Sequence, residues 1–403
     1  MEATGPDHPP HVPPELVVDF DFYRPEGAEV DPFAALKRLH DKPDIFWTPR
    51  NGGHWVATRG EDIRHILEDY ETFSSRFVFV PAARDRPPSI PLEIDPPDHE
   101  KYRRLVIPAF TPPAIAALTE EARNLAISLI EGFQDRGECE FMSEFAQQLP
   151  MIIFLKMAGL PLEHREMLVS WVSTGVRPGD AENRQANRDN LYNYILDLIA
   201  QRRADDSGAD IISQAFRTGV DGRPLNDDEA WGLCNSLLGG GLDTVASSMG
   251  WVALFLARNP DHRRQLIDRP ELIPKAIDEL LRRFSIPTIA RVVRNDMTFK
   301  GAPLKAGEQI LLPACLQALD EEVFANPMEV DFGRTDARLH CTFSQGIHRC
   351  PGSTLALREL KVFLEEWLKR IPEFAIKPGE TVRTSGGIAL GVLHLPLAWP
   401  VSR

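Results

Sequence analysis

Apolar residues recur every three to four positions over much of the middle of the chain. This spacing places them on one side of an α-helix. It predicts helices over 110–133, 151–160, 190–203, 227–257 and 273–284, and a further helix over 353–371. Asn226, followed by three acidic residues, is a capping signal for the helix that starts at 227.

Segments with the pattern of β-strands are fewer. They are 53–58, 289–299, 309–313 and 382–399, and Gly386–Gly387 predicts a turn within the last. Two stretches are rich in proline: an N-terminal arm over 1–14 and a long loop over 78–97, of the length that usually serves function. With no internal repeat and no hinge-like linker, residues 1–403 are expected to form a single, mainly α domain with a minor β part.

Composition excludes several classes of protein. The chain has 45 basic and 59 acidic residues, a net charge of −14, which argues against binding nucleic acid or anionic membranes. No run approaches the length of a membrane span, and the N-terminus lacks the pattern of a signal peptide. The five cysteines are widely spaced without a Cys-x-x-Cys, which argues against a disulfide framework or a structural zinc site and favours the cytoplasm.

The stretch FSQGIHRCPG, residues 343–352, surrounds one cysteine with unusual neighbours. Gly346 and Gly352 allow close approach of the backbone, and Pro351 suits the first turn of the following helix. Cys350 is therefore expected at a helix N-terminus, where a thiolate is favoured. It could ligate a metal, act as a nucleophile or be an ordinary buried cysteine. Haem is one of the few cofactors held by a single protein sulfur.

The stretch LLGGGLDT, residues 237–244, interrupts an apolar helix with three glycines, each costing about 1 kcal/mol relative to alanine. Close helix packing is one explanation. The other is a bend, because the Thr244 hydroxyl can bond the carbonyl of Gly240. Asp243 beside Thr244 then forms an acid–alcohol pair that could relay protons.

Two pairs of polar residues have helical spacing. Glu279 and Arg282 share one face of a helix, which is most often a surface ion pair. His99 and Arg103 lie one turn apart at a predicted helix start, where they could hold carboxylates or simply be solvated.

Together these stretches resemble a known family. FSQGIHRCPG, HVPPELVVDFDFY, NGGHWVATRG, MAGLP, GGLDT, ELLRRFS and LPLAW are similar to segments of the cytochrome P450 monooxygenases, and within them to the soluble bacterial camphor hydroxylases. The resemblance covers nearly the whole chain. It implies the P450 fold, a triangular prism around a buried haem b whose iron is bound by the Cys350 thiolate.

The resemblance also implies roles for individual residues. Asp243 and Thr244 would deliver the protons that cleave the O–O bond, and Arg177 would pair with Asp243. Phe343 and Gly352 would belong to the haem-binding loop, and the haem propionates would be bound by His99, Arg103, Arg291 and His348. Glu279, Arg282 and Arg334 would form a buried structural network.

The implied substrate pocket consists of Phe79, Leu92, Val176, Ser236, Gly239, Gly240, Pro287, Ile289, Ile388 and Ala389. Most of these residues are apolar, as expected of a site that orients a substrate by shape. The chain departs from the camphor enzyme in lacking its substrate-binding tyrosine, near Pro87, and in having small residues at Ser236 and Gly239. A larger terpenoid or norisoprenoid, such as an ionone-like ketone, is therefore expected instead of camphor.

Electrons would come from outside, since the sequence contains no flavin or ferredoxin segment. The resemblance implies an acidic [2Fe–2S] ferredoxin, reduced by an NADH-dependent flavoprotein and docked on a basic patch of Arg103, Arg338 and Arg349. Glu100 stands where the camphor enzyme has a basic residue, which puts use of that enzyme's ferredoxin in doubt. A monomer is expected. A peroxide-using enzyme and a haem-based carrier or sensor stay open as alternatives.

Overall fold

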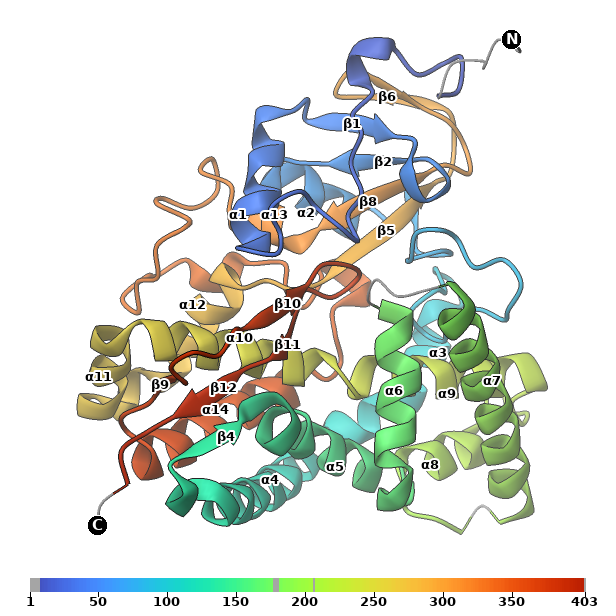
Figure 1. Ribbon diagram of the computed structural model, residues 1–403. Coiled ribbons are helices and arrows are strands. Elements are labelled where there is room, and N and C mark those ends of the chain that lie inside the picture. The colour runs from blue at the N-terminus through green and yellow to red at the C-terminus, as the bar shows by residue number, and fades with distance from the viewer. Residues whose placement is uncertain (1–7, 177–180, 206, 402–403) are drawn as a thin grey trace.

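The structure, a computed structural model, describes residues 8–176, 181–205 and 207–401. Helices make up most of it, and a smaller region of strands lies at one end, at the top of Figure 1. The prediction of a mainly α fold with a minor β part is therefore confirmed.

Most of the helices predicted from periodicity are present with shifted ends. These are α4 (Pro112–Phe133), α5 (Gln148–Met157), α7 (Ala181–Ala204), α12 (Ile273–Arg283) and α14 (Ser353–Arg370). The segment 227–257, predicted as one helix, forms α9 (Asp227–Gly241) and α10 (Thr244–Arg258). The helix start predicted at His99 is confirmed by α3 (His99–Val106). Further helices were not predicted: α1 (Pro32–Lys37), α2 (Gly60–Glu68), α6 (Arg165–Val176), α8 (Ile211–Thr218), α11 (Pro260–Asp268) and α13 (Ala314–Ala318). Most of them are short, and a short helix repeats its apolar spacing too few times to be recognised.

The start of α9 follows from its capping residues. The side chain of Asn226 accepts a hydrogen bond from the backbone N–H of Glu229, and the Glu229 carboxylate accepts one from the N–H of Asn226. This reciprocal capping box satisfies two backbone donors at the helix start. The N-cap predicted at Asn226 is confirmed.

The main sheet has the strand order β1–β2–β8–β5–β3. Its strands are β1 (Ile45–Thr48), β2 (His54–Ala57), β3 (Phe73–Ser74), β5 (Thr288–Val293) and β8 (Gln309–Pro313). Strands β5 and β8 pair antiparallel, with Arg291 opposite Ile310, so Arg291 is fixed within the sheet.

The remaining strands form three small sheets: β6 (Met297–Phe299) with β7 (Ala302–Leu304), β10 (Arg383–Ser385) with β11 (Gly391–His394), and β4 (Glu138–Glu140) with β12 (Pro396–Ala398) and β9 (Ala375–Ile376). The predicted strands are thus present, although 289–299 and 382–399 are each divided.

The apolar core consists of two clusters of buried residues. The larger joins the main sheet to α2, α4, α10, α12 and α14, and the smaller joins α3 and α5 to α9. Helix α9 packs in the smaller cluster through Leu233 and Leu238, whereas α10 packs in the larger through Met249 and Val252. The two helices therefore separate where the chain passes from one cluster to the other.

The stretch that contains α9 and α10, Asp227–Arg258, is long and apolar enough to cross a membrane by length and composition alone. However, 72% of its most apolar window is buried inside the protein. Its apolar surface is therefore used in core packing.

Candidate active site

The cysteine loop, residues 343–352, is held by hydrogen bonds within its own backbone. The N–H of Cys350 donates to the carbonyl of Phe343 at 2.8 Å, and the N–H of Arg349 donates to that of Gly346 at 3.2 Å. Gly346 has a φ of +64°, and a Cβ added to it would lie 3.2 Å from the Cα of Glu68 in α2. A glycine therefore suits both the turn and the close packing of the loop on α2.

Helix α14 begins at Ser353, with Gly352 as its N-cap residue. The expectation that Pro351 occupies the first helical turn is therefore wrong. The reason is that residues 350–352 complete a turn first, in which the N–H of Ser353 donates to the carbonyl of Cys350 at 3.4 Å. The turn leaves backbone N–H groups of Gly352 and Ser353 directed at the sulfur of Cys350.

The Cys350 sulfur differs from the other thiols of the chain. Four of the five cysteines are buried, whereas Cys350 is exposed as a residue. Burial by the surrounding protein raises the pKa of the Cys350 thiol. The N–H of Gly352 and the guanidinium of Arg103 oppose that rise. Donors and a cation that stabilise a thiolate are therefore in place, as a metal ligand requires.

Three buried nitrogen atoms near the loop have no hydrogen-bond partner among the described residues. They are Nη2 of Arg291, Nε2 of His99 and Nε2 of His348. The two imidazole rings are 4.5 Å apart. Burial lowers the pKa of His348 to about 2, helped by the charges of Arg291 and of nearby Arg103. Burial also lowers the pKa of His99 and brings that of Arg291 to about 10.

Buried polar groups without partners are uncommon in proteins, and a group of them in one place can be explained by a bound ligand. Arginine and histidine donors grouped in this way suit carboxylates. An oxygen of Asp95 is 4.0 Å from Nε2 of His348, too far for a hydrogen bond. The donor set therefore fits the two propionates of a haem, for which the Cys350 sulfur would be the protein ligand.

Asp95 itself positions this region, a role that the sequence analysis missed. Its carboxylate accepts hydrogen bonds from the hydroxyl of Ser74, the N–H of Ser75 and the guanidinium of Arg294, at 2.5, 2.9 and 2.5 Å. Its carbonyl accepts from the N–H of His99 at 3.1 Å, at the start of α3. The sequence feature that could have indicated this role is an acidic residue, Asp95, directly before the two prolines at 96–97.

The break between α9 and α10 has the geometry expected from its sequence. The hydroxyl of Thr244 donates to the carbonyl of Gly240 at 3.1 Å. Asp243 is buried and accepts a hydrogen bond from the hydroxyl of Ser247 at 3.3 Å, a partner that was not predicted. Thr244 is exposed beside it. An acid and an alcohol are therefore adjacent, as a proton relay requires. Arg177, the predicted partner of Asp243, lies outside the described residues.

Glu279 and Arg282 form a buried pair and not a surface one. Arg282 donates to the Glu279 carboxylate at 2.7 and 2.9 Å and to three backbone carbonyl groups. Arg334 donates to the same carboxylate at 3.1 Å. A buried ion pair is tolerated only when its remaining donors are satisfied in this way. The same helix is also tied to the residue before the cysteine loop, because the hydroxyl of Thr342 donates to the carbonyl of Leu281 at 2.9 Å.

Several predicted pocket residues are brought together by strand pairing. The N–H of Thr288 donates to the carbonyl of Ile388 at 2.8 Å, and Pro287 forms a bridge with Ala389. The amide of Gln309 donates to the carbonyl of Phe79 at 2.8 Å, which holds the start of the 78–97 loop on the sheet. The half-buried members of the predicted set are Phe79, Leu92, Ser236, Pro287, Ile289 and Ile388, Ala389 is buried, and Gly239 and Gly240 are exposed. Val176 ends α6, and its side chain, like Arg177, lies outside the description.

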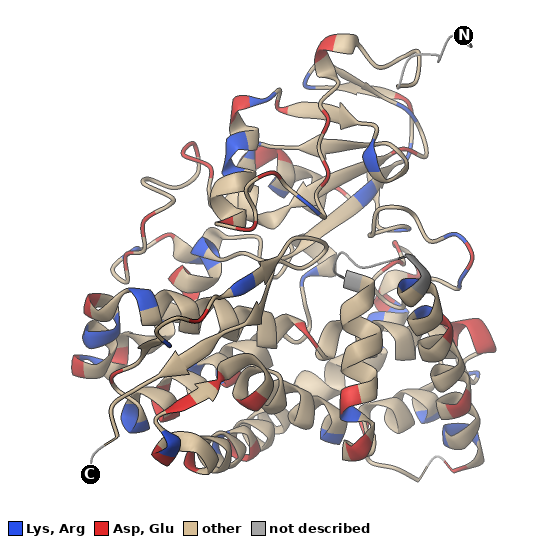
Figure 2. Ribbon diagram, in the orientation of Figure 1, with Lys and Arg blue, Asp and Glu red and all other residues tan. Residues whose placement is uncertain are grey.

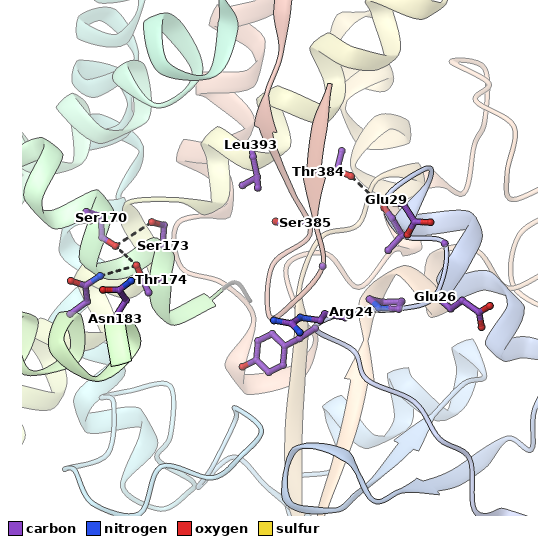
Figure 3. Close-up of a pocket in the computed structure, with 16 residues that line it drawn as sticks. Arg24, Glu26, Glu29, Ser170, Ser173, Thr174, Asn183, Thr384, Ser385 and Leu393 are labelled. Atoms are coloured by element: carbon purple, nitrogen blue, oxygen red, sulfur yellow. Dashed lines mark hydrogen bonds between the residues drawn. The ribbon is translucent and has the colours of Figure 1, made fainter. Parts of the chain in front are cut away.

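A cavity of about 980 Å³ lies beside this set, between residues 23–29, helices α6 and α7 and the β10–β11 hairpin (Figure 3). Polar side chains dominate its described lining, among them Ser170, Thr174, Asn187 and Thr384. None of the predicted pocket residues is among the described residues that line it. Sequence reasoning missed the cavity because its walls come from three segments far apart in the chain.

Comparison with known proteins gives a consistent result. The cytochrome P450 family model matches residues 168–385. A probable cytochrome P450 127A1 of Sinorhizobium fredii is 37% identical, over 97% of this chain and 96% of that protein. Mycinamicin IV hydroxylase/epoxidase of Micromonospora griseorubida is 32% identical, over 86% of this chain and 89% of that protein.

Solved structures agree in fold along the whole chain. Cytochrome P450 CYP101C1 is 39% identical and superposes with a TM-score of 0.87, covering 98% of this chain and 100% of its own. CYP101J2 is 37% identical with a TM-score of 0.86, covering 98% of this chain and 99% of its own.

Proposed function

The chain belongs to the cytochrome P450 family, as a haem monooxygenase close to the camphor hydroxylase subfamily, and we propose that Cys350 is the thiolate that binds its haem b. The observation that carries this assignment is the exposed Cys350 together with the unpartnered nitrogens of His99, Arg291 and His348. Thiolate-bound haem supplies the chemistry of dioxygen activation. The four side chains would fix its iron and its propionates.

Asp243 and Thr244 would hold and move the protons of the reaction. The Thr244 hydroxyl donates to the carbonyl of Gly240, so its oxygen is available to accept a hydrogen bond from a water molecule and hold it in place. The buried Asp243, one residue before it, would supply protons to this water, and the Ser247 hydroxyl would orient the carboxylate. General acid catalysis of this kind typically contributes about 10²- to 10⁴-fold in rate.

The substrate would be an apolar terpenoid or norisoprenoid larger than camphor, such as an ionone-like ketone. Phe79, Leu92, Ile289 and Ile388 would orient it by shape. A Cβ added to Gly239 or Gly240 would meet no atom within 4 Å, which supports a roomy site over α9. Pro87 offers no hydroxyl to a substrate ketone, and loss of such a donor weakens discrimination for camphor.

The electron donor would be an acidic [2Fe–2S] ferredoxin. Against a net charge of −14, with acidic and basic residues interspersed over the helices in Figure 2, a local basic group is needed to attract it. Arg349 is exposed next to the proposed ligand, and Arg103 donates a hydrogen bond to its carbonyl. Arg338 is also exposed, although its guanidinium is 2.6 Å from a carboxylate oxygen of Asp278.

Two measurements test the proposal in order. The carbon monoxide difference spectrum of the reduced protein is expected to be of the thiolate type. Titration with camphor and β-ionone is then expected to give a larger spin-state shift with β-ionone. A full shift with camphor and none with β-ionone would refute the proposed substrate class but leave the thiolate assignment intact.

Coupled turnover tests the partner. With NADH, a flavoprotein reductase and a [2Fe–2S] ferredoxin, we expect substrate-dependent oxygen uptake and one hydroxylated product. Uptake only with added peroxide would instead support the peroxide-using alternative. No uptake under either condition, with a normal carbon monoxide spectrum, would support a carrier or sensor.

A further inference from the structure

The 78–97 loop contains a buried ion pair that the proposed chemistry does not use. Arg86 donates from Nη1 and Nη2 to the two carboxylate oxygens of Glu93, at 2.8 and 3.2 Å. Glu93 is 2% exposed, and its Oε2 also accepts from the N–H of Ser89 at 2.7 Å. Arg86 further donates to the carbonyl of Pro87 at 2.8 Å.

This pair is joined to helix α9. The Ser89 hydroxyl lies 3.1 Å from Nη1 of Arg86 and accepts from the side-chain amide of Asn235 at 2.9 Å. The N–H of Ile90 donates to the carbonyl of Gly232 at 3.0 Å. A Cβ added to Gly232 would lie 2.1 Å from the carbonyl oxygen of Pro88, so the loop rests directly on the helix backbone.

The positions next to these contacts are those of the proposed substrate pocket. Leu92 precedes Glu93 in the loop, and Ser236 follows Asn235 in α9. A carboxylate as buried as Glu93 is costly unless a cation and hydrogen bonds satisfy it. The planar guanidinium does so in a fixed two-point geometry, which a lysine ammonium cannot reproduce.

We propose that Arg86 and Glu93 form a clamp that fixes the 78–97 loop on α9 and thereby sets the distance between Leu92 and Ser236 across the substrate pocket. Arg86 is thus a positioning residue that determines substrate affinity and fit. The inference rests on the proposed function, in which these two side chains contact the substrate.

The test compares R86M with R84M in the haem-containing protein. Arg84 is an exposed arginine of the same loop whose guanidinium lies over the Phe77 ring at 4.7 Å, so R84M removes the same charge without touching the clamp. Hydrogen–deuterium exchange is followed at the amides of Ser89 and Ile90, which the clamp protects. Affinity for β-ionone is followed by the spin-state shift.

In R86M we expect exchange at these amides to accelerate by tenfold or more, because the Glu93 charge is left buried without its cation. The Kd for β-ionone is expected to rise by about tenfold or more, while the carbon monoxide spectrum is unchanged. R84M is expected to stay within about twofold of wild type in both readouts. R86K retains the positive charge but cannot bind the carboxylate at two points, so its exchange rate and Kd are expected to lie between those of R86M and R84M.

The double variant R86M/E93Q separates the clamp from a general loss of stability. Removing the buried charge along with its partner is expected to recover part of the amide protection lost in R86M. If R86M does not fold, E93Q and R86K are compared with R84M in its place. Exchange and Kd in R86M and E93Q equal to those of R84M would overturn the clamp. A wild-type protein without a thiolate-type spectrum would overturn the proposed function instead, and the exchange result would still decide whether the clamp holds the loop.

Discussion

The cysteine loop and the break between α9 and α10 each expose one reactive side chain, but they are built in opposite ways. The loop adds backbone hydrogen bonds, such as that from Cys350 to Phe343, and a left-handed turn at Gly346. At the break, Leu242 and Asp243 lie outside both helices, and the side-chain hydroxyl of Thr244 donates to the carbonyl of Gly240. A cofactor ligand has to stay in one position, whereas a proton relay requires backbone and hydroxyl groups that can change partners.

The largest expected effect is on the loop. Replacing Cys350 by Ala removes the proposed iron ligand, so we expect complete loss of the thiolate-type carbon monoxide spectrum. The matched control is Cys341→Ala, since Cys341 is a buried thiol in the segment that leads into the same loop. A normal spectrum in the Cys350 variant would show that another group holds the iron.

Replacing Thr244 by Ala acts on the break and is expected to leave that spectrum intact. The product formed per NADH is expected to fall about tenfold or more, with peroxide released in its place, because a positioned proton donor is lost. Ser248→Ala is the control, because its hydroxyl donates to the carbonyl of Thr244 at 3.1 Å one turn further along. Equal losses in the two variants would mean that helix geometry, and not the Thr244 hydroxyl, controls coupling.

Acid is expected to destabilise the folded protein near the cysteine loop, by protonating His340, three residues before Phe343. Burial lowers the pKa of His340 from 6.5 to about 3, helped by the charges of Arg282 and Arg349. The unfolded chain therefore binds a proton that the folded chain does not, and stability is present above pH 6.5 and lost as the pH falls toward 3.

His340→Asn keeps an acceptor for the N–H of Thr342, which bonds Nδ1 of the histidine at 3.2 Å. Between pH 7.5 and pH 5, the free energy of unfolding of the variant is expected to fall by about 2 kcal/mol less than that of the wild type. The figure follows from about 1.36 kcal/mol for each pH unit below 6.5. Urea unfolding at the two pH values measures the difference. Parallel losses in both proteins would assign the acid sensitivity elsewhere.

The smallest expected effect contrasts two glycines. Gly346→Ala is expected to destabilise the protein by about 1–2 kcal/mol, because a Cβ is unfavourable at its positive φ. Gly239→Ala has the opposite expectation, since the new Cβ meets no atom within 4 Å and alanine favours helix by about 1 kcal/mol. Denaturation midpoints compare the two. A destabilised Gly239→Ala variant would mean that α9 needs the glycine for its own geometry.

Much of the fold could be read from the sequence because long periodic segments dominate it. Helices such as α4 and α14 repeat their apolar spacing over several turns, so their existence follows from burial of one face. Helix α2, with two turns, and α6 were missed. The predicted start of α14 at 353 is confirmed, but Pro351 was wrongly assigned to its first turn, because residues 350–352 form a turn of their own before the helix.

The candidate site divides in the same way. Local motifs indicated Cys350, Asp243 and Thr244, because each depends on neighbours within a few residues. The role of Asp95 was not visible because its partner Arg294 is distant in sequence, and that of the Arg86–Glu93 pair because its link to α9 runs through the bond from Asn235 to Ser89. Nothing in the local pattern around Glu93 shows that it is 2% exposed.

The sequence by itself determined the helical class of the protein and the cysteine loop, and it indicated a bend at 240–244 as one of two explanations, because short-range spacing and backbone preferences act over a few residues. The tertiary structure decided which buried nitrogens lack partners, that Glu279 and Arg282 are buried, and how the 78–97 loop rests on α9. Burial and charge pairing depend on segments that meet only in the folded chain, so no local pattern could fix them.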